Sequence, residues 1–180
     1  SSMYQFIKNR TDTQNILIVC GPGNNGADGI ALGRLLHKES DITLLLTSKP
    51  KSNMGKLQLK RCQLLGVNIE YSLEKRNYSM IIDCIFGSGL TRELDSKITD
   101  LINSLNQINA YKIACDIPTG ININGQILKS CFQANTTITM GALKKSLFSD
   151  DAKNYVGNIE VANLGIARKI YETSSKCFLL

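Results

Sequence analysis

The stretch NILIVCGPGNNGADGIAL, residues 15–32, constrains the fold more than any other part of the chain. It starts with an apolar run, Ile16 to Cys20, of the kind that a buried parallel strand shows. The run breaks at Gly21-Pro22-Gly23, and a helical pattern follows from Ala27. A strand, a glycine-rich turn and a helix in this order present backbone N–H groups at a helix N-terminus, where anions bind well. The stretch therefore predicts one unit of an α/β fold with an anion-binding turn.

The same turn contains the dinucleotide-binding pattern G-x-G-x-x-G, formed by Gly21, Gly23 and Gly26. An NAD-binding fold would also place an acidic residue at the end of its second strand. That strand, expected over residues 41–47, leads instead into Ser48-Lys49-Pro50-Lys51. The glycine pattern by itself is therefore not sufficient to indicate an NAD site.

Three side chains of the turn are polar where backbone contacts alone would hold a phosphate; they are Asn24, Asn25 and Asp28. Two interpretations follow. Either the turn binds a nucleotide phosphate through its backbone, or it belongs to a site in which these side chains touch a sugar, a metal or a reacting group.

Apolar runs and helical patterns alternate along the rest of the chain. Further strands are expected over 41–47, 68–71, 78–86, 111–116, 136–140 and 158–162. Helices are expected at the start of the chain and over 27–37, 53–65 and 95–106, with a hairpin-like stretch over 121–125 and a polar loop over 144–155. The buried stripe of the helix over 27–37 would be Ile30, Leu32, Leu35 and Leu36. This order predicts one α/β domain over residues 1–180, a doubly wound, Rossmann-like, three-layer α/β/α fold with a mainly parallel central sheet.

Composition excludes several classes of function. At 43% hydrophobic and 20% charged residues, the chain is an ordinary globular protein. The net charge is +6, but Lys and Arg are scattered, so no nucleic-acid-binding stripe is evident, and the basic surface suits either an anionic ligand or no partner. No apolar run has transmembrane length, so no membrane partner is expected. Six cysteines without a C-x-x-C pair indicate a reducing, cytoplasmic location rather than a disulfide framework.

Three expected strands end in polar, glycine-bearing turns, after Cys20, Phe86 and Asp116. Because the carboxyl ends of parallel strands share one edge of the sheet, these turns should converge on one cleft. Asp116 is the best catalytic candidate, since it ends an apolar strand and precedes a turn stiffened by Pro118. A half-buried carboxyl there would have a raised pKa and could shuttle a proton. The alternative is an acid that only hydrogen-bonds the turn.

Asp83 lies inside an expected buried strand, where a carboxylate is costly unless something pairs with it. With the amide oxygen of Asn25 and the hydroxyl of Thr119 it offers a set of oxygen ligands for a cation. One carboxylate with neutral oxygens suits a monovalent cation better than Mg²⁺ or Ca²⁺. The alternative is a structural acid that accepts backbone N–H groups.

Three stretches match motifs of a known family: GPGNNGADG at 21–29, DCIFGSGL at 83–90 and ACDIPTGINING at 114–125, of which the first and third are specific. With the weaker TITMGALK at 137–144 and GNIEVANLGI at 157–166, they resemble the NAD(P)H-hydrate epimerase family, the domain called YjeF N-terminal. The resemblance covers nearly the whole chain in the right order. It implies an isomerase that interconverts the R and S forms of hydrated NADH or NADPH at C6 for cofactor repair.

The resemblance also implies a role for each matching position. Residues that would contact the hydrated nucleotide are Asn24, Asn25, Gly26, Ala27 and Asp28. Residues that would hold its phosphates are Gly87, Ser88, Gly89, Leu90, Thr91, Arg92 and Glu93. Asp116 would contact the substrate, protonate the departing hydroxyl and then activate water. The implied cofactor is one potassium ion per subunit, bound by Asn25, Asp83 and Thr119.

The chain departs from the family pattern at two positions. Ala27 stands where Gly is usual, which would matter if that residue needed a positive φ. Thr119 stands where Ser is usual, and it keeps the hydroxyl. Many bacterial members continue into an ATP- or ADP-dependent dehydratase, a lyase, and the ends of this chain at Ser1 and Leu180 fit an epimerase half of such a multifunctional enzyme. The dehydratase would then act in cis or in trans, and a homo-oligomer stays possible.

Two other functions compete with the epimerase. An NAD(P)-dependent oxidoreductase would transfer a hydride, but the absent acid after the second strand and the polar side chains of the first turn oppose it. A non-catalytic nucleotide-binding or interaction module would be expected to lose its polar cluster. That cluster is intact at Asn24, Asn25, Asp28, Asp83 and Asp116, so the sequence favours the epimerase.

Overall fold

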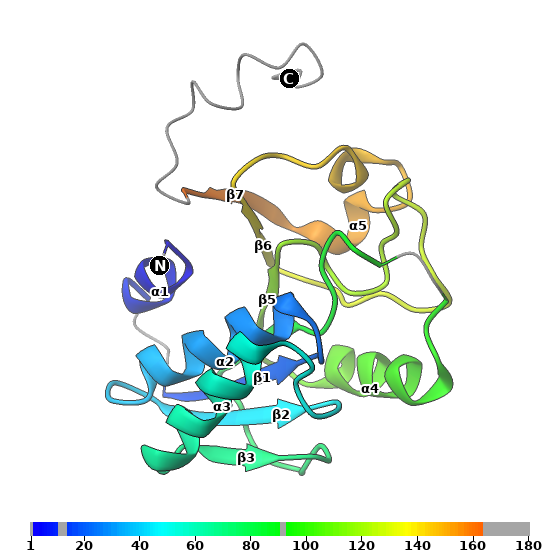
Figure 1. The fold of residues 1–180 in the computed structure, drawn as a ribbon. Helices are drawn as coiled ribbons and strands as arrows, with labels where there is room; N and C mark the ends of the chain where they lie inside the picture. The colour runs from blue at the N-terminus through cyan, green and yellow to red at the C-terminus, as the bar shows by residue number, and fades with distance from the viewer. Residues whose placement is uncertain (1, 11–13, 91–92, 164–180) are drawn as a thin grey trace.

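The computed structural model describes residues 2–10, 14–90 and 93–163. A seven-stranded sheet runs through the molecule in the order β3-β2-β1-β4-β5-β6-β7 (Figure 1). Its strands are β1 (Asn15–Cys20), β2 (Asp41–Leu46), β3 (Asn68–Glu70), β4 (Met80–Cys84), β5 (Tyr111–Cys115), β6 (Thr136–Met140) and β7 (Asn158–Ala162). Each neighbouring pair is parallel, so the described sheet is parallel throughout.

Helices cover both faces of this sheet, which confirms the doubly wound three-layer architecture (Figure 1). They are α1 (Ser2–Lys8), α2 (Asn24–Leu36), α3 (Asn53–Leu64), α4 (Ser96–Gln107), the 3₁₀ turn η1 (Lys145–Phe148) and α5 (Lys153–Val156). The first three helices pack on one face and α4 packs on the other. Asp95 caps α4 as expected, since its carboxylate accepts the backbone N–H of Ile98 at 2.9 Å.

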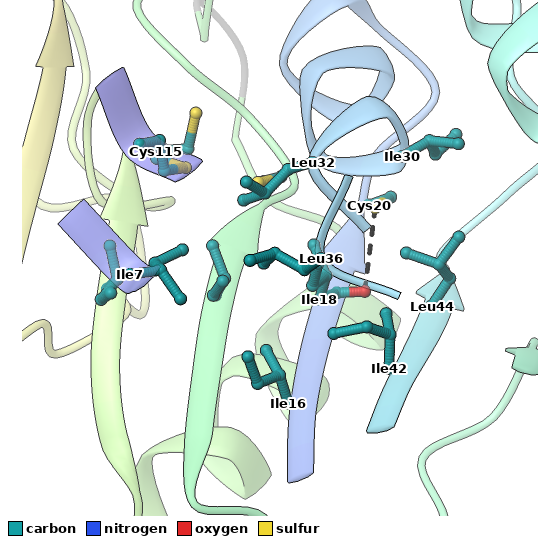
Figure 2. Close-up of a cluster of buried hydrophobic side chains, with 14 of the residues drawn as sticks. Ile7, Ile16, Ile18, Cys20, Ile30, Leu32, Leu36, Ile42, Leu44 and Cys115 are labelled. Carbon is teal, nitrogen blue, oxygen red and sulfur yellow. Dashed lines mark hydrogen bonds between the residues drawn. The ribbon is translucent and has the colours of Figure 1, made fainter. Parts of the chain in front are cut away.

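The core divides according to the alternation of side chains along each strand. In β1, Ile16, Ile18 and Cys20 belong to the cluster on the side of α1 and α2, and Figure 2 shows Leu36 beside Ile18, with Ile7 of α1 farther along the sheet, near the strand of Cys115. Leu17 and Val19 face the opposite layer beneath α4. Because both faces are buried, the central strands read as continuous apolar runs rather than alternating ones.

The strand order reverses between β1 and β4. From β1 the chain moves outward through β2 to β3, then returns to the other side of β1 and continues outward through β5 and β6. At such a reversal the two connections leave in opposite directions and open a crevice beyond the carboxyl ends of the strands. The glycine-rich turn after β1 and the turn after β4 therefore stand on either side of the expected ligand site.

Helix α2 differs from the expectation in its start and in its buried face. It begins at Asn24 rather than Ala27, because Asn-Asn-Gly is a run of poor helix formers whose helical state is decided by packing. Leu35, expected to be buried, is exposed. The helix turns its glycines toward the sheet instead: a Cβ on Gly29 would lie 2.7 Å from the Cβ of Cys84, and one on Gly33 would lie 2.7 Å from Leu44.

The expected polar loop over 144–155 is wrong, since the segment contains η1 and α5. Leu147 and Ala152 of the segment are buried in a separate cluster with Val156 and with Ile117 and Ile121 from the crossover between β5 and β6. These residues are too widely spaced to show a helical period in the sequence. The hairpin-like stretch is confirmed by an antiparallel bridge between Ile121 and Ile127.

Two further expectations concern the cysteines and membrane-spanning segments. The five cysteines that the structure describes are buried free thiols, three of them in the strands β1, β4 and β5. Among the described helices, none is long and apolar enough to cross a membrane. Thr91, Arg92 and the chain end after Asn163 lie outside the described residues.

Candidate functional site

A cavity of about 480 Å³ opens at the carboxyl edge of the sheet, where the strand order reverses. It is lined by Gly23, Asn24, Asn25, Asp28, Ile85, Phe86, Gly87, Ser88, Gly89, Leu90, Asp116 and Met140. The turns after β1, β4 and β5 therefore converge as the sequence predicted, and the end of β6 joins them. The volume is in the range of small-molecule and cofactor sites.

The glycine-rich turn is packed too tightly for side chains at two of its positions. A Cβ on Gly21 would lie 1.9 Å from the carbonyl oxygen of Ile85, and one on Gly26 would lie 1.8 Å from the carbonyl oxygen of Gly21. The Gly21 N–H also donates to the carbonyl of Cys84 at 3.0 Å, which joins the turn to the end of β4. These contacts fix the start of α2 beside the cavity.

The residues of α2 that were predicted to contact the nucleotide fall into two groups. Asn24, Asn25 and Asp28 line the cavity, whereas Gly26 and Ala27 are buried away from it. Ala27 is helical and is not among the described residues with positive φ, so its methyl group introduces no backbone strain. A Cβ added to Gly55 in α3 would lie 3.4 Å from that methyl group, so the methyl faces α3 and contributes to helix packing.

The residues after β4 that were predicted to hold the phosphates also differ in whether they line the cavity. Gly87, Ser88, Gly89 and Leu90 line the cavity. Glu93 does not line it, and its carboxylate pairs with the ammonium of Lys129 at 3.0 Å. The expected roles of Thr91 and Arg92 fall outside the described residues.

Asp116 projects into the cavity from a left-handed backbone conformation, with φ of 71°. Such a conformation is uncommon for a residue other than Gly, Asn or Asp, and it turns the side chain away from the line of β5. One carboxylate oxygen, Oδ2, accepts the Ser88 N–H at 3.1 Å. The other, Oδ1, accepts the Met140 N–H at 3.2 Å and the ammonium of Lys144 at 2.5 Å.

The expectation of a raised pKa for Asp116 is wrong. Burial by itself would raise the pKa, but the hydrogen bond and positive charge of Lys144 oppose it, helped by the N–H groups of Ser88 and Met140. The result is a pKa below the ordinary value of 3.8. Asp116 is therefore a carboxylate at neutral pH, a form with no proton to donate.

Sequence reasoning missed Lys144, the cation that pairs with Asp116, and it also missed the cavity-lining residues Ile85, Phe86 and Met140. Lys144 lies 28 positions after Asp116 in the turn that follows β6, and no local pattern connects the two residues. The weak match TITMGALK ends on this lysine and was the one signal that could have indicated it.

Asp28 is a second carboxyl group on the same cavity. Desolvation at the cavity wall raises its pKa above the usual 3.8, and the negative charge of Asp116 raises it further. The site thus holds two carboxyl groups whose pKa values are shifted in opposite directions, the arrangement by which active sites separate an acid from a base.

Asp83 is fully buried in β4 and bonded to neutral groups. Its Oδ2 accepts the Thr119 N–H at 2.7 Å, and its Oδ1 accepts the Ile85 N–H at 3.0 Å and the Thr119 hydroxyl at 2.8 Å. Burial raises the pKa of Asp83 to about 6, although these three donors act to lower it. In the described part of the chain Asp83 forms no ion pair, so its negative charge is not compensated.

The expected cation ligands surround one short piece of backbone, residues 85–87. Asp83 bonds the N–H of Ile85, Thr119 accepts the N–H of Phe86 at 3.0 Å, and a Cβ on Gly87 would lie 3.5 Å from the Cγ of Asn25. The buried amide Nδ2 of Asn25 has no hydrogen-bond partner. Rotating that amide by 180° would present its oxygen at the same place. An uncompensated carboxylate, a hydroxyl and an unpartnered amide fit a monovalent cation.

Fold and site together define an α/β protein with a ligand-binding cleft at the topological switch point of a parallel sheet. Comparison with known proteins gives the family. The model of the family described as "YjeF-related protein N-terminus" matches residues 1–146, and the chain belongs to this family.

Relatives of known name cover most of the chain. The bifunctional NAD(P)H-hydrate repair enzyme Nnr of Helicobacter pylori is 38% identical over 179 residues, which are 97% of this chain and 38% of that protein. The NAD(P)H-hydrate epimerase of Levilactobacillus brevis is 36% identical over 160 residues, 86% of this chain and 74% of that protein. The chain thus spans little more than a third of the length of the Helicobacter relative.

A solved structure supports the fold alone. The crystal structure of yeast ynu0 (YNL200c) superposes with a TM-score of 0.69 over 86% of this chain and 70% of that chain, at 16% sequence identity. The Rossmann-like architecture is therefore shared with a known structure at a low level of sequence identity.

Proposed function

We propose that this chain is an isomerase that epimerises hydrated NADH and NADPH at C6 of the reduced nicotinamide ring, in the repair of damaged cofactor. The observation that carries the proposal is the meeting of Asp28 and Asp116 with the amides of Asn24 and Asn25 on one cavity. The names of the relatives from Helicobacter pylori and Levilactobacillus brevis point to the same chemistry. A carboxyl pair and neutral polar groups suit proton transfer around a nucleotide.

The two carboxyl groups divide the acid and base work. In the substrate, the lone pair of the ring nitrogen helps to expel the hydroxyl from C6 and leaves a planar cation. Asp28, the more easily protonated of the two, gives its proton to the departing hydroxyl, which leaves as water. Asp116 then takes a proton from a water molecule that adds to the opposite face, and one proton passes between the carboxyl groups to reset the site. In this scheme Asp28, rather than Asp116 as expected from the sequence, protonates the leaving oxygen.

Backbone groups of the two turns would hold the nucleotide. Helix α2 begins at Asn24 beside the cavity, and the first N–H groups of a helix have no partner within the helix. The turn at Gly87 and Gly89 also lines this cavity. The N–H of Ser88 is already bonded to Asp116, so it would orient the carboxylate rather than a phosphate.

A potassium ion is part of this proposal. Asp83 and Thr119 would supply a carboxylate and a hydroxyl oxygen, and Asn25 would supply its amide oxygen. The bound ion would add positive charge beside the substrate. It would also compensate the buried carboxylate of Asp83, for which the described residues offer no cation.

This ion predicts a pH-dependent stability. Asp83 has a pKa of about 6 in the folded chain against 3.8 ordinarily, so the folded state holds the proton more tightly. Without potassium, the free energy of unfolding should therefore fall by about 3 kcal/mol as the pH rises from about 4 to about 6. Potassium binds the ionised carboxylate, so at pH 8 it should raise the melting temperature relative to choline chloride at equal ionic strength, and at pH 5 this difference should shrink.

The control for the potassium effect is a matched pair of variants. Asp83→Asn should lose the difference between the two salts at pH 8, whereas Asp100→Asn, at an exposed position of α4, should keep it. Differential scanning calorimetry measures both. Equal melting temperatures in potassium and choline for the unmodified chain at pH 8 would remove the ion from the proposal.

The proposal extends to the cellular setting. A dehydratase specific for the S form, in cis or in trans, would consume the product, as the bifunctional name of the Helicobacter relative suggests. A reducing cytoplasm suits the five free thiols that the structure describes.

A coupled assay tests the function. The mixed R and S hydrates are supplied with an S-specific dehydratase, and NADH is followed by its absorbance with and without the chain. We expect recovery to rise from the S fraction alone to nearly all of the hydrate. Recovery that stays at the S fraction, with potassium present and the chain folded by circular dichroism, would exclude the epimerase.

A further inference from the structure

Lys144 is held in one place by three acceptors. Its ammonium donates to Asp116 Oδ1 at 2.5 Å, to the Thr139 hydroxyl at 2.9 Å and to the Met140 carbonyl at 2.6 Å. Three donors and three acceptors leave no N–H for a ligand. Lys144 is also absent from the residues that line the cavity, so it stands behind Asp116 rather than beside the substrate.

The turn after β6 brings the lysine to this position. Gly141 has a φ of 75°, and the Ala142 N–H donates to the Met140 carbonyl at 2.9 Å. These features turn the chain back, so that the side chain of Lys144 reaches across the ends of β5 and β6. The pair is largely shielded, with 23% of the Lys144 side chain and 13% of the Asp116 side chain exposed.

The hydrogen bonds of Asp116 also specify its protonation state. Its two oxygens face three donors, which are the ammonium of Lys144 and the N–H groups of Ser88 and Met140. A protonated carboxyl would have to place its own hydrogen among these donors, whereas a carboxylate accepts all of them. The charged groups that act on Asp116 among the described residues are Lys144 after β6 and Asp28 on α2.

We infer that Lys144 is a positioning residue for the proposed reaction: its ammonium keeps Asp116 ionised and fixes the rotamer in which the carboxylate meets the substrate. The inference rests on the proposed function for its catalytic consequence. The ion pair itself is a property of the free chain. Its effect on Asp116 can therefore be measured without any substrate.

The test compares three variants of this turn. Lys144→Met removes the ammonium and keeps the length of the side chain, and Lys144→Arg keeps a positive charge. Lys145→Met is the matched control, because the neighbouring lysine is exposed and makes no contact with Asp116. The first readout is the ¹³C NMR titration of the Asp116 carboxyl in the free chain, identified by its disappearance in Asp116→Asn. We expect the midpoint to rise by about one pH unit or more in Lys144→Met.

Kinetics provide the second readout. In Lys144→Met we expect kcat of the coupled epimerase assay to fall about tenfold or more, with KM changed less than about threefold, and the acidic limb of kcat to move to higher pH. Lys144→Arg should restore part of both effects, and Lys145→Met should show neither. If Lys144→Met is poorly folded, Lys144→Gln serves instead, since it keeps a hydrogen-bond donor without the charge.

The outcomes separate this inference from the proposed function. An unchanged Asp116 titration in the Lys144 variants would overturn the inference, and so would normal kcat with a shifted titration. A shifted titration in a chain that fails to epimerise the hydrates even unmodified would refute the proposed function and support the ion pair as the determinant of the Asp116 charge.

Discussion

Asp116→Asn lowers kcat by about 10²–10⁴-fold and leaves substrate affinity within a few-fold of normal, because Asn cannot accept the proton that the proposed reaction transfers. Asn has nearly the same shape, and it tolerates the left-handed conformation at φ of 71° that this position requires. The backbone turn should therefore survive. The coupled assay measures kcat, and calorimetric titration of the variant with the hydrate measures affinity.

Two controls show whether the fall in kcat comes from the loss of the Asp116 carboxylate. Asp151→Asn, at an exposed position before α5, removes an equal charge from a residue that does not line the cavity, and it should be fully active. The melting temperature of Asp116→Asn shows whether the unpaired Lys144 ammonium has disturbed the fold. Turnover near that of the unmodified chain would exclude Asp116 as the base.

Gly26→Ala destabilises the fold by about 3 kcal/mol or more, because the new methyl group has no room. Its carbon would lie 1.8 Å from the carbonyl oxygen of Gly21, and backbone on both sides of the contact is held by strand β1 and helix α2. Replacing Gly with Ala in a helix usually stabilises it by up to about 1 kcal/mol, which is less than the cost of this steric overlap. Urea unfolding measures the change in free energy.

Gly23→Ala is the matched control for stability. It lies three positions earlier in the same turn, with a φ of −89° that any residue adopts and no atom within 4 Å of the added carbon. Because Gly23 is the N-cap of α2, where Ala is less favourable than Gly, the variant's free energy of unfolding should fall by no more than about 1 kcal/mol. Equal stability of the Gly26→Ala and Gly23→Ala variants would show that the turn can relax around the methyl group.

The sequence predicted which strands and turns form the site because each of them depends on residues close together in the chain. An apolar run of five or six residues specifies a buried parallel strand, and a following glycine specifies a turn with little room. Parallel strands end at a common edge, so the order of strands and turns was enough to assign Asn24, Asp28 and Asp116 to one cleft. The start of α2 was misplaced because a run of Asn and Gly has low helix propensity, which tertiary packing overrides.

The chemistry of Asp116 was misjudged for a different reason. A carboxyl at the end of an apolar strand has a raised pKa if burial dominates, and a sequence shows burial but not the partner. The partner, Lys144, comes from a turn beyond the next strand and is one of many scattered basic residues.

The amino-acid sequence by itself determined the order of strands and helices, the glycine-rich turn and the acids at the strand ends, since each depends on residues close together in the chain. Only the tertiary structure decided in which direction the pKa of each acid is shifted, raised for Asp28 and lowered for Asp116. A pKa depends on charges and donors within a few ångströms, and here those come from α2, β4, β5 and the turn after β6.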